Sequence, residues 1–233
     1  MQLAYLGLYS VLNTNNYKIL NLMKNLKIGL LVDNLNFDDF NSELIDILEK
    51  NKLFKIETII INKFDKRGIK FYLNKYSFLR IIEKVLFKLV NLFEKNFLYK
   101  FFFKYNFPKK NIRDTNIDKL FVHPIIGKSA YYYNYSESDL KKIREKKLDV
   151  LIRMGGGILK GDILNVAKNG IISFHHGDND YNRGGPPGFW EVYYKIPKTG
   201  FIIQRLNENL DAGNVLFKGY FETKLFYYQN KQS

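Results

Sequence analysis

Short apolar runs separated by amphipathic segments recur along this chain, and they predict an α/β fold. The first run, residues 27–33, is apolar and ends in a polar pair, as a buried strand does. Apolar residues then recur at helical spacing over 44–48, with Asp38 or Asn41 available as the N-cap. Residues 54–61 are β-branched and predict a second strand. This order indicates a parallel sheet with a crossover helix.

Residues from about 65 to 135 interrupt the alternation, and we assign them to a helical insertion. From Phe78 onwards apolar residues recur every three or four positions, with Arg, Lys, Glu and Asn on the other face. The helix runs into residues 97–104, which are aromatic and basic. Such a helix either packs its apolar face on a core or makes peripheral contact with a membrane surface or a partner. For residues 78–104 both interpretations stay open.

The alternation resumes after residue 135. Ser136 or Ser138 caps a predicted helix over 139–147. Further elements are predicted as strands at 148–152 and 171–174, a Gly-rich turn at 155–157, a short helix near 162–168, and antiparallel additions at 201–204 and 214–221. The whole pattern predicts a Rossmann-like, mostly parallel sheet flanked by helices, with a helical insertion and an antiparallel C-terminal edge.

Charge and composition narrow the partners and the compartment. The formal net charge is +14, which suits an anionic partner, but lysine is abundant along the whole chain and no nucleic-acid motif accompanies it. We therefore attribute the charge to compositional bias and do not expect a nucleic acid partner. No apolar run of about 18 residues predicts a transmembrane helix. The absence of cysteine excludes disulfides and thiolate chemistry and fits a reducing compartment, so we expect a cytoplasmic protein.

The two ends of the chain differ from its middle. Residues 1–22 do not resemble the rest of the chain, and Met23 directly precedes the first predicted strand. We expect residues 1–22 to be an extension or a start-site artefact, and residues 23–233 to form one domain. The final residues, 226–233, end abruptly, which predicts a chain truncated at its C-terminus.

Two of the three histidines lie side by side at the end of the predicted strand at 171–174, before a loop rich in Gly, Pro, Asn and Asp. An α/β fold usually builds its site at such a strand end. Ser173 and His175 are two apart, so their side chains share a face, while His176 points to the other. Asp211 begins an Asp-Ala-Gly turn, and a His–Asp pair fixes an imidazole tautomer and raises its pKa.

Two other interpretations compete for this region. The loop aspartates Asp178 and Asp180 would bind a divalent metal with the two histidines, as in a metal-dependent hydrolase, although the loop lacks a recognised ligand spacing. Residues 155–157 would cradle a phosphate, but their spacing is neither a Rossmann fingerprint nor a P-loop. We expect a plain tight turn there and no bound metal.

From His175 to Leu216 the sequence resembles the folate-dependent formyltransferases, which include methionyl-tRNA, glycinamide ribonucleotide and sugar N-formyltransferases. The family has Asn-x-His, then Arg/Lys-Gly, Pro, Thr-Gly and Asp-x-Gly. The matching residues here are His175, Arg183-Gly184, Pro187, Trp190, Thr199-Gly200 and Leu210-Asp211-Ala212-Gly213. Upstream, Gly156-Gly157-Ile158-Leu159 is similar to the family's Gly-x-Ile-Leu loop, and residues 27–33 to its first strand. The resemblance is firm over residues 148–217.

The resemblance implies a catalytic domain over 23–233 that transfers a formyl group from 10-formyltetrahydrofolate to a primary amine. It implies that His175 stabilises the oxyanion as an imidazolium, with Asp211 holding it charged and relaying the amine proton. Main-chain groups around Gly156, Gly157, Ile158, Leu159, Asn209 and Leu210 would hold the pterin ring. The loop residues facing the substrate would be His176, Asp178, Arg183, Gly184 and Pro187.

One departure from the family bears on catalysis, because Ser173 stands where the family has Asn. A hydroxyl reaches less far than a carboxamide, and losing an oxyanion donor costs about 2.7–4 kcal/mol of barrier. The chain is therefore either a divergent transferase or a formyltransferase-like binding protein without catalysis. The expected acceptor is an amino sugar or another small or nucleotide-linked amine. Transfer RNA is disfavoured, because the chain ends soon after Phe221 without an RNA-contacting domain.

Overall fold

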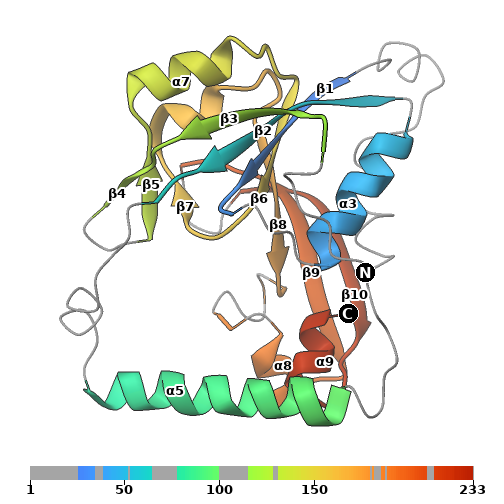
Figure 1. The fold of residues 1–233 in the computed structure, drawn as a ribbon. Helices are drawn as coiled ribbons and strands as arrows, with labels where there is room; N and C mark the ends of the chain where they lie inside the picture. The colour runs from blue at the N-terminus through green and yellow to red at the C-terminus, as the bar shows by residue number, and fades with distance from the viewer. Residues whose placement is uncertain are drawn as a thin grey trace. The chain divides into compact units, whose positions relative to one another are not determined.

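The computed structural model of the protein describes residues 26–34, 39–51, 53–64, 78–99, 115–127, 131–178, 180, 185–186, 188–208 and 213–232 (Figure 1). The chain divides into two compact units, which are described separately below. Unit 1 comprises Met1–Phe64, Phe107–Arg183 and Gly200–Tyr220, and unit 2 comprises Asp65–Asn106, Gly184–Thr199 and Phe221–Ser233.

The main feature of unit 1 is a seven-stranded sheet in the order β10-β9-β8-β6-β1-β2-β3. The strands are β1 (Leu26–Val32), β2 (Phe54–Asn62), β3 (Asp118–Val122), β6 (Val150–Met154), β8 (Ile171–His176), β9 (Lys198–Arg205) and β10 (Asn214–Glu222). The pairs β1–β2, β1–β6, β2–β3 and β6–β8 are parallel, whereas β8–β9 is antiparallel. The predicted α/β fold with a mostly parallel sheet is thereby confirmed.

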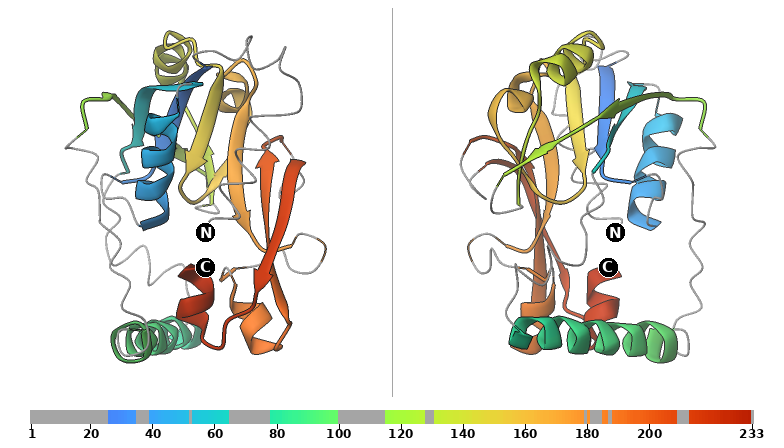
Figure 2. Two further views of the ribbon diagram at one scale, coloured as in Figure 1. Left: turned by 90° about the vertical axis from the view of Figure 1, so that its right-hand side faces the viewer. Right: turned by 60° about the vertical axis from the view of Figure 1, so that its left-hand side comes forward.

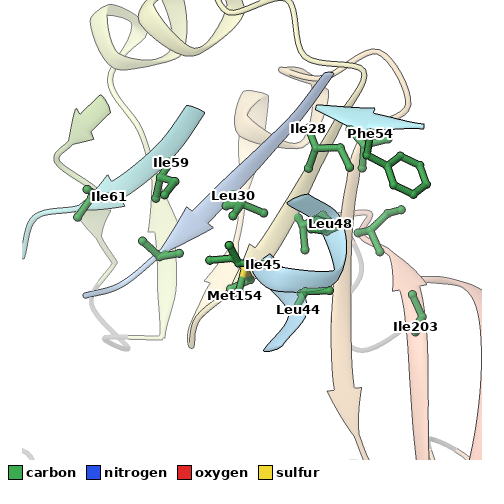
Figure 3. Close-up of a cluster of buried hydrophobic side chains, with 14 residues drawn as sticks. Ile28, Leu30, Leu44, Ile45, Leu48, Phe54, Ile59, Ile61, Met154 and Ile203 are labelled. Atoms are coloured by element: carbon green, nitrogen blue, oxygen red, sulfur yellow. The ribbon is translucent and has the colours of Figure 1, made fainter. Parts of the chain in front are cut away.

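Helices cover both faces of this sheet, because successive side chains of each strand point to opposite faces. On one face, α3 (Asp39–Lys50) packs Leu44, Ile45 and Leu48 against apolar residues of β1, β2 and β6 (Figure 3). On the other face lie α7 (Glu137–Arg144) and the 3₁₀ helix η3 (Gly161–Asn165), as the views in Figure 2 also show. Each buried Leu or Ile side chain contributes about 1.5–3 kcal/mol to stability.

The start of α7 follows the predicted cap. Ser136 is the N-cap, and its hydroxyl accepts a hydrogen bond from the Asp139 N–H at 3.3 Å. Glu137 and Asp139 place negative charge in the first turn, where the helix dipole favours it. Leu140 and Ile143 are buried against the sheet, so capping and burial agree on where this helix begins.

A second, three-stranded sheet lies within unit 1, and part of it comes from the segment predicted as a helical insertion at 65–135. Its order is β4-β5-β7, where β4 is Ile125–Ile126, β5 is Tyr132–Asn134 and β7 is Ile158–Leu159. The same segment also supplies β3, at the end of the main sheet. These strands have two to five residues, which is too short for alternation to reveal them in the sequence.

Unit 2 contains α5 (Phe78–Phe93), the π-helical turn η1 (Glu94–Tyr99), α8 (Phe189–Tyr193) and α9 (Tyr227–Gln232). The Phe87 ring lies 5.6 Å from the Phe189 ring and 5.4 Å from the Tyr227 ring, between centroids. The Tyr228 N–H donates to the Glu94 carboxylate at 2.6 Å. In all views α8 and α9 lie on the same side of α5 (Figures 1 and 2).

The apolar face of α5 and η1 is on the surface and is not part of a core. Leu79 is 71% exposed, Leu89 56% and Phe97 66%. The core-packed arrangement considered from the sequence is therefore not the one observed, and residues 100–104 lie outside the described residues. Within the described ranges, none of the helices combines the length and the hydrophobicity that a membrane span requires.

Candidate active site at the carboxyl edge of the sheet

The parallel strands β1, β2, β6 and β8 end at one edge of the sheet, called here the carboxyl edge. Near this edge a row of aligned residues crosses four strands: Leu31 pairs with Arg153, Arg153 with Ser173, and Ser173 with Gln204. Aligned residues share a face, and Leu31 belongs to the cluster packed against α7. Ser173 therefore lies on the α7 face, as does His175 two residues further along β8.

A buried ion pair lies beside this row. Arg153 is 3% exposed, and its Nη2 lies 2.8 Å from Asp33 Oδ1 and 2.9 Å from Asp33 Oδ2. Arg153 also donates to the carbonyl oxygens of Leu31 (at 3.3 Å) and Gly156. The Asp33 carboxylate accepts further hydrogen bonds from Asn62 Nδ2 at 2.8 Å and from the Gly156 N–H at 2.7 Å. These contacts tie the ends of β1, β2 and β6 together.

Tyr135 completes this polar cluster from the segment after β5. Its hydroxyl donates to Asn62 Oδ1 at 2.9 Å in a buried position. Burial raises the pKa of Tyr135 to about 12, although the nearby Arg153 and the Asn62 hydrogen bond act to lower it. The phenol is therefore neutral at physiological pH and acts as a hydrogen-bond donor. Because Asn62 bonds both Tyr135 and Asp33, the cluster is continuous from β5 to β1.

The ion pair shapes the glycine-rich turn that the sequence places at 155–157. A Cβ atom on Gly155 would lie 2.4 Å from Asp33 Oδ2, and one on Gly157 would lie 2.4 Å from the Tyr133 ring. Gly157 also has a φ of 77°, which disfavours other residues. After the turn, Ile158 and Leu159 form β7 and pair with β5. The predicted pterin-contacting residues Gly156 to Leu159 thus form a turn and strand anchored on Asp33 and Arg153.

Ser173 and His175 are both half-buried. The Ser173 hydroxyl makes a long hydrogen bond of 3.3 Å to the carbonyl oxygen of Phe174. Phe174 itself packs against the α3-side cluster, which agrees with the alternation of β8. Gln204, opposite Ser173, is 4% exposed, and its Oε1 has no hydrogen-bond partner among the described residues. A buried acceptor without a partner is rare and needs an explanation.

The loop after β8 is anchored by Asp178. This carboxylate is 4% exposed and accepts from Lys218 Nζ at 2.6 Å, from the Tyr220 hydroxyl at 2.6 Å and from the Asp180 N–H at 2.9 Å. Burial acts to raise the pKa of Asp178, but the hydrogen bonds from Lys218, Tyr220 and the Asp180 N–H together lower it below its ordinary value. Asp178 thus fixes the loop to β10, and its predicted place facing the substrate stays a prediction.

The same geometry argues against the metal site considered from the sequence. His175 and His176 point to opposite faces of β8, and His176 is exposed. Asp180 also pairs with Lys218, at 2.6 Å, so both loop aspartates already have a cation. Among the described residues, no group of three His, Cys, Asp or Glu side chains could hold a metal ion.

Several predicted site residues lie outside the described residues, namely Arg183, Gly184, Pro187, Asn209, Leu210 and Asp211. The pairing of His175 with Asp211 therefore stays a prediction. The chain on the far side of this gap returns near the row, because a Cβ atom on Gly213 would lie 3.0 Å from Gln204 Oε1.

Sequence reasoning missed the cluster formed by Asp33, Asn62, Tyr135 and Arg153, and it missed Gln204. One signal is present, because Arg153 directly follows an apolar strand, where a charged residue needs a buried partner. The sequence marks Asp33 only as a strand end. Asn62 and Tyr135 carry no such signal, since their contact joins residues 73 positions apart.

Comparisons with known proteins give a partial match in sequence and a match in fold. No family model matches the chain. The methionyl-tRNA formyltransferase of Gloeothece citriformis is 32% identical over 82 residues, which are 35% of this chain and 25% of that protein. The chain spans about a quarter of the length of the curated relatives it matches.

Two solved structures share the fold. A formyltetrahydrofolate deformylase from Pseudomonas syringae pv. tomato has a TM-score of 0.55 at 12% identity, covering 89% of this chain and 55% of that one. The phosphoribosylglycinamide formyltransferase from Campylobacter jejuni has a TM-score of 0.50 at 17% identity, covering 89% and 87%. At these identities the structures show the fold alone, and the curated relative adds a match in sequence. The chain is thus similar to folate-dependent formyltransferases in the sequence of this segment and in fold.

Proposed function

We propose that the protein transfers a formyl group from 10-formyltetrahydrofolate to a primary amine. The observation that carries the proposal is that Ser173 and His175 share the α7 face of β8 at the carboxyl edge. On the neighbouring strand the aligned residue, Arg153, holds the Gly155–Gly157 turn in place. By analogy with folate-dependent formyltransferases, the turn would contact the folate, and the side chains of Ser173 and His175 would lie beside the reacting carbonyl.

In the proposed reaction the substrate amine is the nucleophile. Its lone pair forms a C–N bond to the formyl carbon, and the C=O electron pair moves onto the formyl oxygen. When the C=O bond re-forms, the bond from the formyl carbon to N10 of the folate breaks, and its electrons stay on N10. One proton leaves the substrate nitrogen and N10 gains one. The protein must therefore stabilise an oxyanion and relay a proton.

The residues present fit these two tasks. As an imidazolium, His175 would donate a hydrogen bond to the oxyanion, and Asp211 would hold that charge and relay the proton. Among the described residues, a Cβ atom on Gly156 would meet only Asp33 Oδ2, at 3.9 Å, which is consistent with room for a flat ring beside the main chain of the turn. Main-chain groups of Gly156 to Leu159, with those of Asn209 and Leu210, would hold the pterin.

We propose an amino sugar, or another small or nucleotide-linked amine, as the acceptor. The loop from Gly177 to Asp180 is polar, which suits a hydroxyl-rich molecule. Asp178 holds this loop against β10 through Lys218 and Tyr220, so the wall beside the histidines is stiff. A stiff wall favours a small, defined acceptor because little ordering is needed on binding.

A second candidate is a binding protein of the same fold that no longer transfers the group. The observation that favours it is Ser173, which stands where the family has Asn. Such a protein would bind 10-formyltetrahydrofolate at the Gly155–Leu159 segment without turnover.

The test is an assay of formyl transfer from 10-formyltetrahydrofolate to a panel of nucleotide-linked amino sugars, glycinamide ribonucleotide and methionyl-tRNA, with products identified by mass spectrometry. Transfer that is lost in His175→Ala and in Asp211→Ala supports the proposal. His123→Ala is the matched control, since His123 is the third histidine and lies exposed after β3. Folate binding without transfer to any amine would favour the second candidate, and release of formate alone would exclude an amine acceptor.

A further inference from the structure

Gln204 on β9 has a carboxamide side chain, and it lies beside position 173, where the family has the carboxamide of Asn. It lies directly opposite Ser173 on the antiparallel neighbour of β8. Side chains of directly opposed residues share a face, with Cβ atoms about 4.5–5.5 Å apart. Two residues further along β8, His175 pairs with Ile202, so Gln204 is the diagonal neighbour of His175. Diagonal neighbours are within reach of a long side chain.

The Gln204 carboxamide is also not used elsewhere at its acceptor end. The side chain is 4% exposed, and Oε1 has no hydrogen-bond partner in the described part of the chain. A half-turn about the last side-chain bond exchanges Oε1 and Nε2, so the group can present either a donor or an acceptor. An unpaired polar group held inside a protein is destabilising, and such groups often mark a functional role.

We propose that Gln204 supplies the carboxamide that the family carries at position 173. Its Nε2 donates a hydrogen bond to the formyl oxygen as negative charge develops there, alongside His175. Serine at position 173 is shorter than asparagine, and Gln204, directly opposite on β9, carries a longer side chain. The inference rests on the proposed function, and it explains how the change from Asn to Ser is compatible with catalysis.

Substitution of Gln204 by Met tests this role, because Met has a similar length and no polar end. We expect kcat for formyl transfer to fall by about 10²–10³-fold, the usual effect of removing one oxyanion donor, while KM for 10-formyltetrahydrofolate changes little. The double variant Ser173→Asn/Gln204→Met should recover much of the lost kcat, because asparagine in place of Ser173 would restore a carboxamide at the family's position.

The outcomes separate this inference from the proposed function. If the unaltered protein transfers formyl groups and Gln204→Met does so equally well, Gln204 has no such role and the proposed function stands. If Gln204→Met is inactive, unfolds at a lower temperature and is not rescued by Ser173→Asn, its role is structural and the inference is wrong. If the unaltered protein transfers no formyl group, the proposed function fails and the inference fails with it.

A separate observation concerns the exposed apolar face of α5 and η1. The residues of this face are 39–71% exposed and fall within an arc of about 160° at 100° per residue: Leu79, Ile82, Val85, Leu86, Leu89, Val90, Leu92, Phe93 and Phe97. The helix contacts α8 and α9 through Phe87 and Glu94, which lie outside that arc. Unit 2 therefore packs against the polar side of this helix and leaves the apolar side open.

The charges on the polar side of α5 indicate which kind of partner its exposed apolar side contacts. Arg80, Lys84 and Lys88 lie opposite the apolar arc, and Glu83 is the single acidic residue between them in sequence. A helix with a basic polar face and a Leu- and Phe-rich apolar face is suited to the interface of an anionic bilayer.

We infer that α5 lies in the surface of an anionic membrane, with its apolar face toward the lipid and α8 and α9 on the water side. The test is flotation of the full chain with phosphatidylcholine vesicles and with equimolar phosphatidylcholine–phosphatidylglycerol vesicles. Only the latter should bind the protein. Leu86→Asp/Leu89→Asp should abolish binding without a change in the circular dichroism spectrum, because both leucines are exposed.

A charge-matched pair of variants distinguishes this face from the general positive charge of the protein. Lys84→Glu/Lys88→Glu should weaken vesicle binding by about tenfold or more, since each basic residue near the surface contributes about fivefold. The control Lys141→Glu/Lys168→Glu changes two exposed lysines of unit 1 by the same charge and should have little effect. Equal loss in both variants, no binding to anionic vesicles, or a dimer that dissociates in Leu86→Asp/Leu89→Asp would overturn the inference.

Discussion

Replacing Asp33 by Ala would leave the buried Arg153 guanidinium without its carboxylate. Arg153 is 3% exposed, and its remaining bonds are to the carbonyl oxygens of Leu31 and Gly156. The hydrogen bonds that the Asp33 carboxylate accepts from Asn62 and from the Gly156 N–H would disappear together with the ion pair. The change therefore removes the group to which the ends of β1, β2 and β6 are tied.

The expected loss follows from the burial of the two partners. Removing one partner of a buried ion pair costs about 3–5 kcal/mol, because the other charge stays behind without compensation. The Asp33 side chain is 20% exposed, so water partly screens the pair and we expect the lower end, about 3 kcal/mol. For a chain of this size that corresponds to a fall in Tm of about 6–12 °C.

Thermal unfolding followed by circular dichroism measures this change, with Asp118→Ala as the control. Asp118 also forms an ion pair, with Lys146 at 2.9 Å, but its side chain is 54% exposed. It accepts from the Thr58 hydroxyl at 3.0 Å, and in Asp118→Ala that hydroxyl keeps the carbonyl oxygen of residue 118 as an acceptor, so the loss should cost no more than about 1 kcal/mol. The double variant Asp33→Leu/Arg153→Met should be more stable than Asp33→Ala, since it leaves no buried charge. If Asp33→Ala lowers Tm no more than Asp118→Ala does, the ion pair does not hold this edge of the sheet together.

Three further predictions concern the same unit. Gly157→Ala should destabilise unit 1 by about 1–3 kcal/mol in denaturant titration, because its φ is 77° and the added Cβ would meet the Tyr133 ring. Asp178→Asn should lower Tm at pH 7, because the lowered pKa of Asp178 makes its ionised form stabilising above pH 3.8. The difference in Tm between the unaltered protein and the variant should vanish as pH falls below that value. A difference in Tm that stays constant with pH would contradict the pairing with Lys218. Tyr135→Phe should cost about 1–3 kcal/mol at neutral pH. Because the pKa of Tyr135 is raised from 10.0 to about 12, the wild-type advantage should be full below pH 10 and decline as pH rises through 12 in a stability profile.

Much of the sheet could be predicted because its strands are long and apolar. Residues 27–33 and 54–61 correspond closely to β1 and β2, whose side chains are buried on both faces. The strand predicted at 171–174 continues to His176 in the structure, so both histidines belong to β8. Polar residues at a strand end look like a loop in the sequence, but here backbone pairing with β9 extends the strand through them.

The polar cluster could not be predicted, because it depends on which strand ends meet. Asp33, Asn62 and Arg153 come from three strands separated by crossover connections, and only the strand order brings them together. Likewise, the importance of Gln204 depends on the register of β9 against β8, since a shift of one residue would turn its side chain to the other face. Registers of this kind are not encoded in local patterns of hydrophobicity.

The three consecutive glycines of the turn differ in what they tolerate. Gly155 and Gly157 leave no room for a side chain, whereas a Cβ atom on Gly156 would meet, in the described part of the chain, only Asp33 Oδ2 at 3.9 Å. The chain has no cysteine, so Gly156→Cys would introduce a unique thiol beside the proposed folate position. A fluorophore or spin label attached there would report ligand binding directly, without requiring that the amine acceptor be known.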